Sequence, residues 1–259
     1  MVSELMLQQT QVSRVVPKYE AFLARFPDPA SCAATPAAET VRLWAGLGYN
    51  RRALSLHRAA RNVADRHAGR LPGTLAELLA LPGVGPYTAR AVLCFAFERD
   101  VGVLDSNAAR VLSRSVTLRP IRQAEADELV PAGRGWAWNQ ALLDLGALVC
   151  RPRPRCDVCP LAAAGCAWHA AGRSTPDPWR PGPRQPRFEG SDRQGRGRLV
   201  EALRRGPLRL DRLARASGWP EDPHQAQRVA AGLVHEGFAV CSDGRLSLLG
   251  ESASHRVTA

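Results

Sequence analysis

Residues 78–111 constrain the fold most, because their pattern is that of a helix, a glycine turn and a second helix. Residues 78–81 end an apolar segment and residues 82–85 form a tight turn. Pro86 stands where the next helix would begin, since the first helical turn leaves its N–H groups unbonded and proline has none to lose. The glycines allow a close backbone approach, and the N–H groups that open the second helix form an anion site. The pattern predicts either a hairpin between core helices or a clamp for a DNA phosphate.

A third helix is predicted to begin in the same stretch. Residues 101–104 are a short apolar segment, and Asp105 precedes a helix predicted at residues 106–115. An aspartate in this position is typical of an N-cap, whose carboxylate accepts hydrogen bonds from the first backbone N–H groups. From the residues alone, Asp105 is predicted to be such a cap.

The charge of the chain favours a polyanionic partner. There are 35 basic and 24 acidic residues, the net charge is +11, and every basic residue except Lys18 is an arginine. Guanidinium groups suit bidentate phosphate contacts, although a GC-rich genome also raises the arginine content. No stretch has the apolar length of a membrane helix, and the first residues lack the regions of a signal peptide. We expect a cytoplasmic protein with roughly two compact domains.

Four of the seven cysteines are clustered. They are Cys150, Cys156, Cys159 and Cys166, separated by five, two and six residues. In a cytosolic chain such a cluster predicts a metal site rather than disulfides. Zinc and a 4Fe–4S cluster both accept four thiolates, so the spacing leaves the metal open.

The rest of the chain has a mainly helical pattern. Residues 4–26 show helical spacing interrupted at Pro17, which predicts two helices or one helix with a break there. Five of the 20 prolines fall within residues 173–186, which predicts a linker. Helices are then predicted near residues 198–205, 208–217 and 224–236, followed by short strands near 239–241 and 245–248. This order resembles a winged helix.

Five motifs together resemble the adenine DNA glycosylases of the MutY type, in the helix-hairpin-helix glycosylase superfamily. They are SELMLQQTQV at 3–12, WAGLGY at 44–49, LPGVG at 81–85, LDSN at 104–107 and the four cysteines. The resemblance covers most of the first two thirds of the chain, and the ending resembles actinobacterial members. It implies a mainly α fold: a helix-hairpin-helix glycosylase with a four-cysteine cluster domain and a small winged-helix-like C-terminal module.

The predicted domains follow the order of the chain. Residues 1–115 form a helical barrel-type domain with the helix-hairpin-helix, 116–170 an iron–sulfur cluster domain, 171–187 a Pro/Arg-rich linker, 188–250 the winged-helix-like module and 251–259 a tail. The resemblance implies a 4Fe–4S cluster on the four cysteines, with zinc as the alternative. It also implies a bacterial, nucleoid-associated monomer that binds double-stranded DNA and has no membrane partner.

The resemblance implies a DNA repair glycosylase that hydrolyses the N-glycosidic bond of adenine mispaired with 8-oxoguanine or guanine. Glu4 would protonate the flipped adenine and Asp105, supported by Asn107, would stabilise the charge on the sugar. This division is sensible, because N-glycoside cleavage needs an acid at the base and an anion at the sugar. Tyr87 stands where glycosylases of the endonuclease III type have a Schiff-base lysine, and Lys18 lies far away in sequence, so the enzyme is predicted to be monofunctional.

Three motifs are expected to contact DNA. By resemblance, Gln9 and Tyr49 wedge into the duplex, while Thr10 and Leu47 contact the partner base. The remaining DNA-binding residues are predicted to be Gln8 in the first motif and Gly83, Val84 and Gly85 in the glycine turn.

Two other functions remain open. A thymine or uracil mismatch glycosylase also carries a tyrosine at the position of Tyr87, although the run at residues 8–11 favours adenine. A non-catalytic DNA-binding protein is the alternative from another class, because Met1 almost directly precedes the Ser-Glu motif. Family members carry a helical segment there, and a catalytic acid next to a free terminus would fray. The native start is therefore predicted upstream of Met1, and the chain as written lacks the support that an active Glu4 needs.

Overall fold

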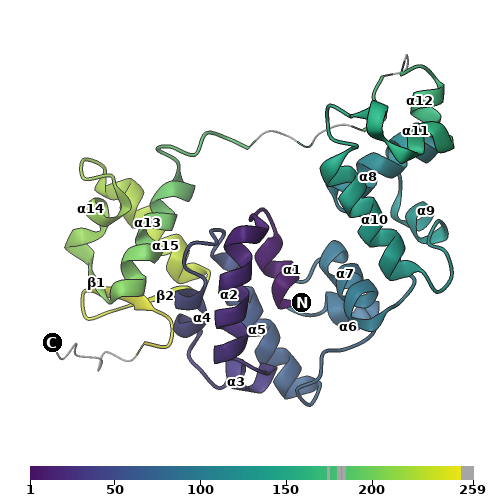
Figure 1. The fold of residues 1–259 in the computed structure, drawn as a ribbon. Coiled ribbons are helices and arrows are strands. Elements are labelled where there is room, and N and C mark those ends of the chain that lie inside the picture. Colours follow the sequence, from purple (N-terminus) through teal and green to yellow (C-terminus); the bar gives the residue numbers. More distant parts are fainter. Residues whose placement is uncertain (174–175, 180–181, 183–184, 252–259) are drawn as a thin grey trace. The chain divides into compact units, whose positions relative to one another are not determined.

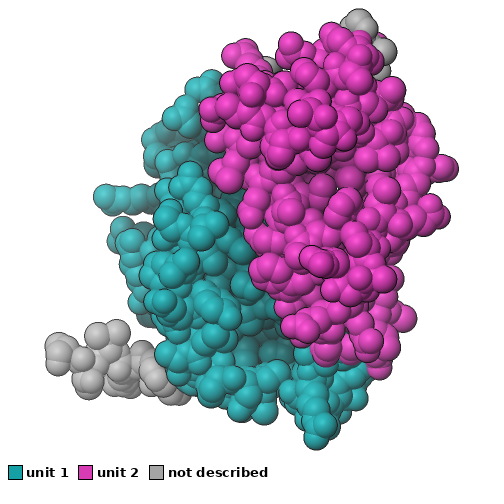
Figure 2. All heavy atoms as spheres, turned by 45° about the vertical axis from the view of Figure 1, so that its right-hand side comes forward, with its two compact units in different colours: residues 1–72, 81–83, 185–259 teal, residues 73–80, 84–184 magenta. Residues whose placement is uncertain are grey.

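The computed structural model describes residues 1–173, 176–179, 182 and 185–251. Over these residues the chain is mainly helical with one small sheet (Figure 1). It divides into two compact units, coloured separately in Figure 2: residues 1–72, 81–83 and 185–259 form unit 1, and residues 73–80 and 84–184 form unit 2. The N-terminal residues and the described C-terminal residues 185–251 thus belong to one unit, whereas the predicted domains follow the chain order. The predicted boundaries stay a prediction.

Unit 1 starts with five helices. They are α1 (Val2–Leu7), α2 (Val12–Arg25), α3 (Pro29–Ala33), α4 (Ala37–Leu43) and α5 (Arg51–Arg66). The predicted break at Pro17 is wrong, because Pro17 lies inside α2 and the break falls at residues 8–11. Pro17 is exposed, so water can reach the carbonyl that its missing N–H leaves without a partner. Gln9 breaks the helix instead, with a φ of 53°.

The C-terminal module of unit 1 contains the predicted helices and both predicted strands. Its elements are α13 (Asp192–Arg205), β1 (Leu208–Arg209), a 3₁₀ turn (Leu210–Arg212), α14 (Leu213–Ser217), α15 (Pro223–His235), β2 (Ala239–Ser242) and β3 (Arg245–Leu248). The antiparallel sheet has the order β1-β3-β2. The helix predicted at residues 208–217 is only partly right, because Leu208 and Arg209 pair with Leu246 and Arg245 and form a strand. Its identity as a winged helix stays a prediction.

One apolar core joins the N-terminal helices to this module. Trp44 and Leu56 from the helices and Leu203 and Phe238 from the module belong to it, each at most 2% exposed. Helix α13 also lies against α4 (Figure 1). There the Arg204 side chain donates from Nε to the Val41 carbonyl oxygen (3.0 Å) and from Nη2 to Asn50 Oδ1 (2.8 Å). The module is therefore packed into unit 1 and is not a loose appendage.

Unit 2 contains the helices on both sides of the glycine turn and the cysteine segment. They are α6 (Leu75–Leu79), α7 (Pro86–Phe97), α8 (Ser106–Leu112), a π-helical turn (Ser113–Thr117), α9 (Gln123–Glu128), α10 (Gly135–Leu148), a 3₁₀ turn (Cys156–Val158), α11 (Pro160–Ala164) and α12 (Ala167–Ala170). Pro86 is the first residue of α7, as predicted. Helices α8, α9 and α10 share an apolar cluster that includes Val111, Ala126 and Leu142. Among the described helices, none is both long and apolar enough to cross a membrane.

Candidate active site and DNA-binding surface

Asp105 caps α8, as the sequence predicts. Its Oδ1 accepts hydrogen bonds from the backbone N–H groups of Asn107 and Ala108 (both 2.7 Å), and its Oδ2 accepts one from Asn107 Nδ2 (2.9 Å). Three N–H donors thus hold both carboxylate oxygens. The helix N-terminus also carries partial positive charge, which stabilises an anion there. The orientation of Asp105 is therefore fixed before any substrate binds.

A buried asparagine holds the segment that leads to Asp105. Asn139, 1% exposed on α10, accepts a hydrogen bond from the Val103 N–H (2.8 Å) and donates to the Val101 carbonyl oxygen (2.9 Å). Residues 101–103 pair with no strand, so this side chain takes the place of a ladder of backbone bonds. Sequence reasoning missed Asn139, because next to Gln140 it resembles a residue on the polar face of the helix.

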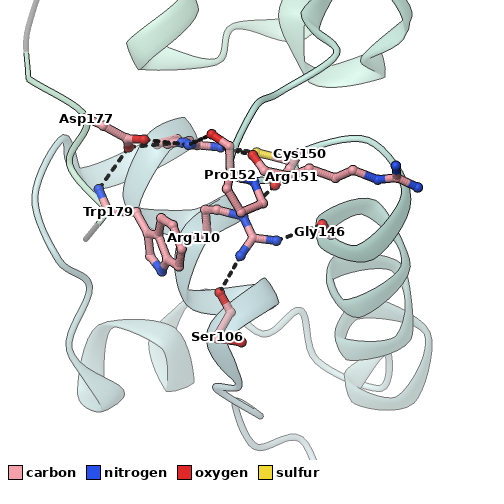
Figure 3. A network of polar contacts seen from close by, with 9 residues as sticks. Ser106, Arg110, Gly146, Cys150, Arg151, Pro152, Asp177 and Trp179 are labelled. Atoms are coloured by element: carbon pink, nitrogen blue, oxygen red, sulfur yellow. Dashed lines mark hydrogen bonds and ion pairs between the residues drawn. The ribbon is translucent and has the colours of Figure 1, made fainter. Parts of the chain in front are cut away.

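Arg110 supports Asn107 from the other side, and Figure 3 shows its bonds to Ser106 and Gly146. It is 3% exposed, and its Nη2 donates to Asn107 Oδ1 (2.8 Å) and to the Gly146 carbonyl oxygen (2.8 Å). With Asn107 Oδ1 engaged in this way, Nδ2 is left to face Asp105. A side chain at position 146 would place its Cβ 2.7 Å from Asn107 Cβ, so α10 can approach α8 this closely only with glycine there. Burial lowers the pKa of Arg110, whose other bonds run to carbonyl oxygens.

A second buried arginine, Arg114, lies one helical turn further along the chain. Arg114, with a side chain 1% exposed, donates from Nε and Nη2 to the two carboxylate oxygens of Asp177 (3.0 and 2.5 Å). The ring centroid of Trp179 lies 4.8 Å from the guanidinium carbon of Arg110. Burial alone would lower the pKa of Arg114, but the bonds to Asp177 and Cys150 raise it above its usual value. Residues 177 and 179, from the predicted linker, thus cover the two guanidiniums.

The four clustered cysteines line one small cavity. Arg114, Trp168 and His169 also line it, and Arg114 Nη1 donates to Cys150 Sγ (3.5 Å). All four are free thiols, and burial raises the pKa of Cys150. Within the described ranges, no three His, Cys, Asp or Glu side chains are arranged to hold a metal ion. The structure therefore gathers the predicted ligands at one cavity without forming a finished metal site.

Glu4 lies on α1 in unit 1, half-buried beside the buried Leu5 and Met6. The end of this helix is held by Arg52, which is 8% exposed. Arg52 Nη1 donates to the carbonyl oxygens of Leu5 (2.6 Å), Met6 (3.0 Å) and Gln8 (2.6 Å). The last carbonyls of a helix have no partner inside it and carry partial negative charge, so a buried guanidinium is a fitting partner.

Arg52 also holds the loop at residues 46–49, the second of the loops predicted to contact DNA. Its Nη2 donates to the carbonyl oxygens of Leu47 and Gly48 and to Thr10 Oγ1, each at 3.1 Å. Burial lowers the pKa of Arg52. One side chain therefore ties residues 5–10 to residues 47–48. Sequence reasoning missed it, because an arginine at the start of an amphipathic helix resembles a solvent-facing residue.

The predicted DNA-contacting residues of unit 1 differ in exposure. Gln9 and Tyr49 are exposed and both have a positive φ, of 53° and 45°. Such angles are unusual for residues other than glycine and are found at functional sites. Thr10 is partly buried, donating to the Leu47 carbonyl oxygen (3.2 Å), and the Leu47 side chain is only 4% exposed. The predicted base contact of Leu47 stays a prediction.

The glycine turn has the backbone features of the predicted clamp. Gly83 has a φ of 78°, and Gly85 is the N-cap of α7 without a side-chain cap. Gly85 has no side chain to cap α7, so the backbone at the start of this helix is open to a close approach. Val84 is 7% exposed, and Tyr87 packs against a small cluster that includes Cys94 and Val103.

Comparison with known proteins identifies the family. Residues 2–130 match the HhH-GPD superfamily of base excision DNA repair proteins. The chain is 40% identical over 265 residues to the adenine DNA glycosylase of Mycolicibacterium smegmatis, with 99% of this chain and 89% of that protein covered. It is 41% identical over 171 residues to the human adenine DNA glycosylase, with 62% and 31% covered.

Solved structures agree with this fold. A thermostable thymine-DNA glycosylase matches with a TM-score of 0.61 and 30% identity, over 66% of this chain and 82% of that one. An endonuclease III trapped on DNA matches with a TM-score of 0.59 and 22% identity, over 67% and 84%, and shows the fold alone. The fold and the near full-length likeness lead to one conclusion: this chain belongs to the adenine DNA glycosylases of the HhH-GPD superfamily.

Proposed function

We propose that this chain is a monofunctional DNA glycosylase that hydrolyses the N-glycosidic bond of adenine mispaired with 8-oxoguanine or guanine. The observation that carries the proposal is the carboxylate of Asp105, held by three N–H donors at the start of α8. A fixed anion is what stabilises positive charge on a sugar during cleavage. The near full-length relatives named adenine DNA glycosylase support adenine as the base.

In the proposed reaction, the flipped adenine receives a proton from Glu4 as its bond to the sugar breaks, and the bonding electron pair leaves with the base. Asp105, oriented by Asn107, stabilises the positive charge that develops on the sugar. Water then bonds to the sugar carbon and gives a proton to the Glu4 carboxylate. The products are free adenine and an abasic site.

We propose that the enzyme does not cut the strand. A β-elimination through a Schiff base needs an amine, and Tyr87 occupies the position where such relatives have lysine. The single lysine of the sequence, Lys18, lies on α2. Strand breaks are expected only after alkali acts on the abasic site.

The proposed DNA contacts come from loops with fixed backbones. Gln9 and Tyr49 are exposed and enter the duplex, while Gln8, Thr10 and Leu47 support or contact the partner base. Gly83, Val84 and Gly85 hold a phosphate at the N-terminus of α7, where the partial positive charge of the helix end favours an anion.

We infer that Cys150, Cys156, Cys159 and Cys166 hold a 4Fe–4S cluster. The donor set fits, because four thiols line one cavity and the buried guanidinium of Arg114 reaches it, which suits an anionic iron–thiolate group. Such a cluster, when bound, would cross-link the cysteine segment and provide an electron-transfer centre. Iron and sulfide analysis of the purified protein tests this. One equivalent of zinc without iron would contradict it.

Single-turnover base release tests the activity. Four matched duplexes carry adenine opposite 8-oxoguanine, adenine opposite guanine, thymine opposite guanine, and uracil opposite guanine. Adenine release from the first two, with strand breaks only after alkali, is the expected result. Thymine or uracil release would instead establish a mismatch glycosylase of another specificity.

Glu4→Gln separates an enzyme from a DNA-binding protein. The variant should lose base release and keep most of its affinity for the duplex, because the amide cannot protonate adenine. Glu20→Gln, at an exposed position on α2, is the matched control and should behave as wild type. A wild-type chain that binds DNA without releasing any base would favour the non-catalytic alternative.

A further inference from the structure

The C-terminal module lines a groove together with the DNA-contacting loops of unit 1. The groove has a volume of about 740 Å³ and lies wholly within unit 1. Gln9, Arg14 and Tyr49 line it from the N-terminal part, and Gln185, Phe188 and Arg193 line it from the C-terminal part. The proposed function uses Gln9 and Tyr49 and gives no role to Arg14 or to the residues of the C-terminal part.

The Gln185 carboxamide is bonded to both proposed wedge residues. Its Nε2 donates to Gln9 Oε1 (3.0 Å), and its Oε1 accepts from the Tyr49 hydroxyl (3.1 Å). The same oxygen accepts from Arg193 Nη1 (2.9 Å). One side chain from the start of the module therefore links Gln9, Tyr49 and α13.

Gln9 and Tyr49 need such support. Both have a left-handed backbone, which costs free energy for residues other than glycine and persists only when surrounding contacts impose it. Gln9 is exposed and Tyr49 is 45% exposed, so core packing does not hold either side chain. Gln185 makes one hydrogen bond to each of these side chains, and the Arg52 guanidinium also lies over the Tyr49 ring, 5.6 Å from its centroid.

The groove also has uncompensated positive charge. Arg51 and Arg196 share the carboxylate of Glu236, at 2.7 and 2.6 Å. Over the described part of the chain, Arg14 and Arg193 take part in no ion pair. Arg193 lies over the Phe188 ring, 5.3 Å from its centroid, and donates to the Pro186 carbonyl oxygen (3.0 Å), so its guanidinium is held in place. A fixed guanidinium without a carboxylate partner suits a phosphate.

We propose that the C-terminal module is part of the DNA-binding surface. Arg193, with Arg14 across the groove, binds backbone phosphates of the duplex, and Gln185 is a positioning residue that orients Gln9 and Tyr49. This inference rests on the proposed function, because it requires that the two wedge residues meet DNA. It gives the module a role in binding that the glycosylase chemistry alone does not require.

The salt dependence of binding tests the phosphate contact. The full chain and a duplex with adenine opposite 8-oxoguanine are used, and the affinity is measured over a range of salt concentrations. Arg193→Gln should lower the slope of log affinity against log salt by about 1, as expected for one lost phosphate contact. Arg205→Gln is the control, since Arg205 lies at the other end of α13 with a side chain 79% exposed and does not line the groove. Equal slopes for the two variants would overturn the phosphate contact.

A double-mutant cycle tests the positioning role. Gln185→Ala should weaken binding by about three- to tenfold, the usual effect of losing neutral hydrogen bonds. Gln227→Ala, at an exposed position of α15, should leave binding unchanged. In a Gln9→Ala, Tyr49→Ala, Arg193→Gln background, Gln185→Ala should have no further effect, because all three residues that its side chain bonds are gone or changed. An undiminished effect in that background would overturn the positioning role.

The outcomes for the two proposals can be told apart. If the wild-type chain releases adenine but Gln185→Ala and Arg193→Gln match their controls, the role of the module is refuted and the glycosylase function stands. A wild-type chain without affinity for any duplex would overturn both proposals.

Discussion

Buried arginines organise the proposed site in each unit, but the two units neutralise them differently. Arg52 in unit 1 caps the C-terminus of α1, and Arg110 in unit 2 bonds the Gly146 carbonyl oxygen near the C-terminus of α10. In both cases burial lowers the pKa of the arginine. Both guanidiniums therefore rely on carbonyl oxygens that a helix end leaves without partners.

The difference lies in the second arginine of unit 2. Among the described residues Arg52 forms no ion pair. Its guanidinium donates to seven oxygen atoms that carry only partial charge. Arg110 and Arg114 are one helical turn apart and repel each other, and the Asp177 carboxylate offsets their charge. One buried guanidinium can be balanced by dipoles, whereas two neighbouring ones need a counter-charge. The arrangement in unit 2 should thus depend on Asp177 and on pH, and that in unit 1 should not.

Removing Arg52 should have the largest effect on stability. Arg52→Met keeps most of the apolar stem but leaves the carbonyls of both DNA-contacting loops without a donor. We expect a loss of about 3 kcal/mol in the free energy of unfolding, measured by urea denaturation. Arg51→Met is the control, because Arg51 has a side chain 71% exposed and should cost little. Equal losses for the two variants would show that Arg52 does not hold the loops.

Asp177→Asn should destabilise the protein by a smaller amount. The amide keeps the shape of the carboxylate but leaves two buried guanidiniums without a counter-charge. Because the Asp177 side chain is 34% exposed, water offsets part of the loss, and we expect about 1–2 kcal/mol. Asp211→Asn breaks the exposed pair with Arg209 and should be nearly neutral. If Asp177→Asn is also neutral, dipoles alone balance both arginines and the two units do not differ.

The sequence predicts local features of this fold better than features that depend on tertiary contacts. The caps and turns were predictable, because Asp105 and Pro86 act on neighbouring backbone groups. The strand at Leu208 and Arg209 was not, since it exists only through pairing with β3. Local sequence can predict where a helix begins, but it does not indicate which distant segment will pair with a strand.

The supporting residues of the site were unpredictable for the same reason. The motifs pointed to Asp105 and Gln9 by resemblance, but Arg52, Arg110 and Asn139 were indistinguishable from polar residues on helix faces. Each is buried by elements distant in sequence and bonds carbonyls or amides there. Their roles depend on tertiary packing, which no local pattern records.

Asn107→Ala compares the buried arginines of the two units by their effect on activity. Arg52 bonds mainly backbone carbonyl oxygens, whereas Arg110 bonds the side chain of Asn107, which belongs to the proposed site. The variant removes the amide that joins Arg110 to Asp105 and should lower the single-turnover rate of adenine release about tenfold, or about 1.4 kcal/mol. Ser106→Ala is the control, since the neighbouring Ser106 side chain is exposed and Arg110 bonds only its backbone oxygen. An unchanged rate would mean that the backbone N–H groups of α8 suffice to orient Asp105.

The smallest expected difference between the two units is in how mild acid changes the contribution of their buried arginines to the free energy of unfolding. Burial acts to raise the pKa of Asp177, but the hydrogen bonds from Arg114 and from the Trp179 N–H outweigh it, and the pKa lies below its usual value. A carboxyl group whose pKa is lower in the folded state adds stability above its unfolded pKa of about 3.9, and this stability is lost as the pH falls through the folded pKa. Between about pH 5 and pH 3, the difference in unfolding free energy between wild type and Asp177→Asn should shrink by about 1 kcal/mol. The difference between wild type and Arg52→Met should stay constant over the same range, because no carboxylate balances Arg52. If both differences shrink in parallel, acid acts on the whole fold and not on the Asp177 contact.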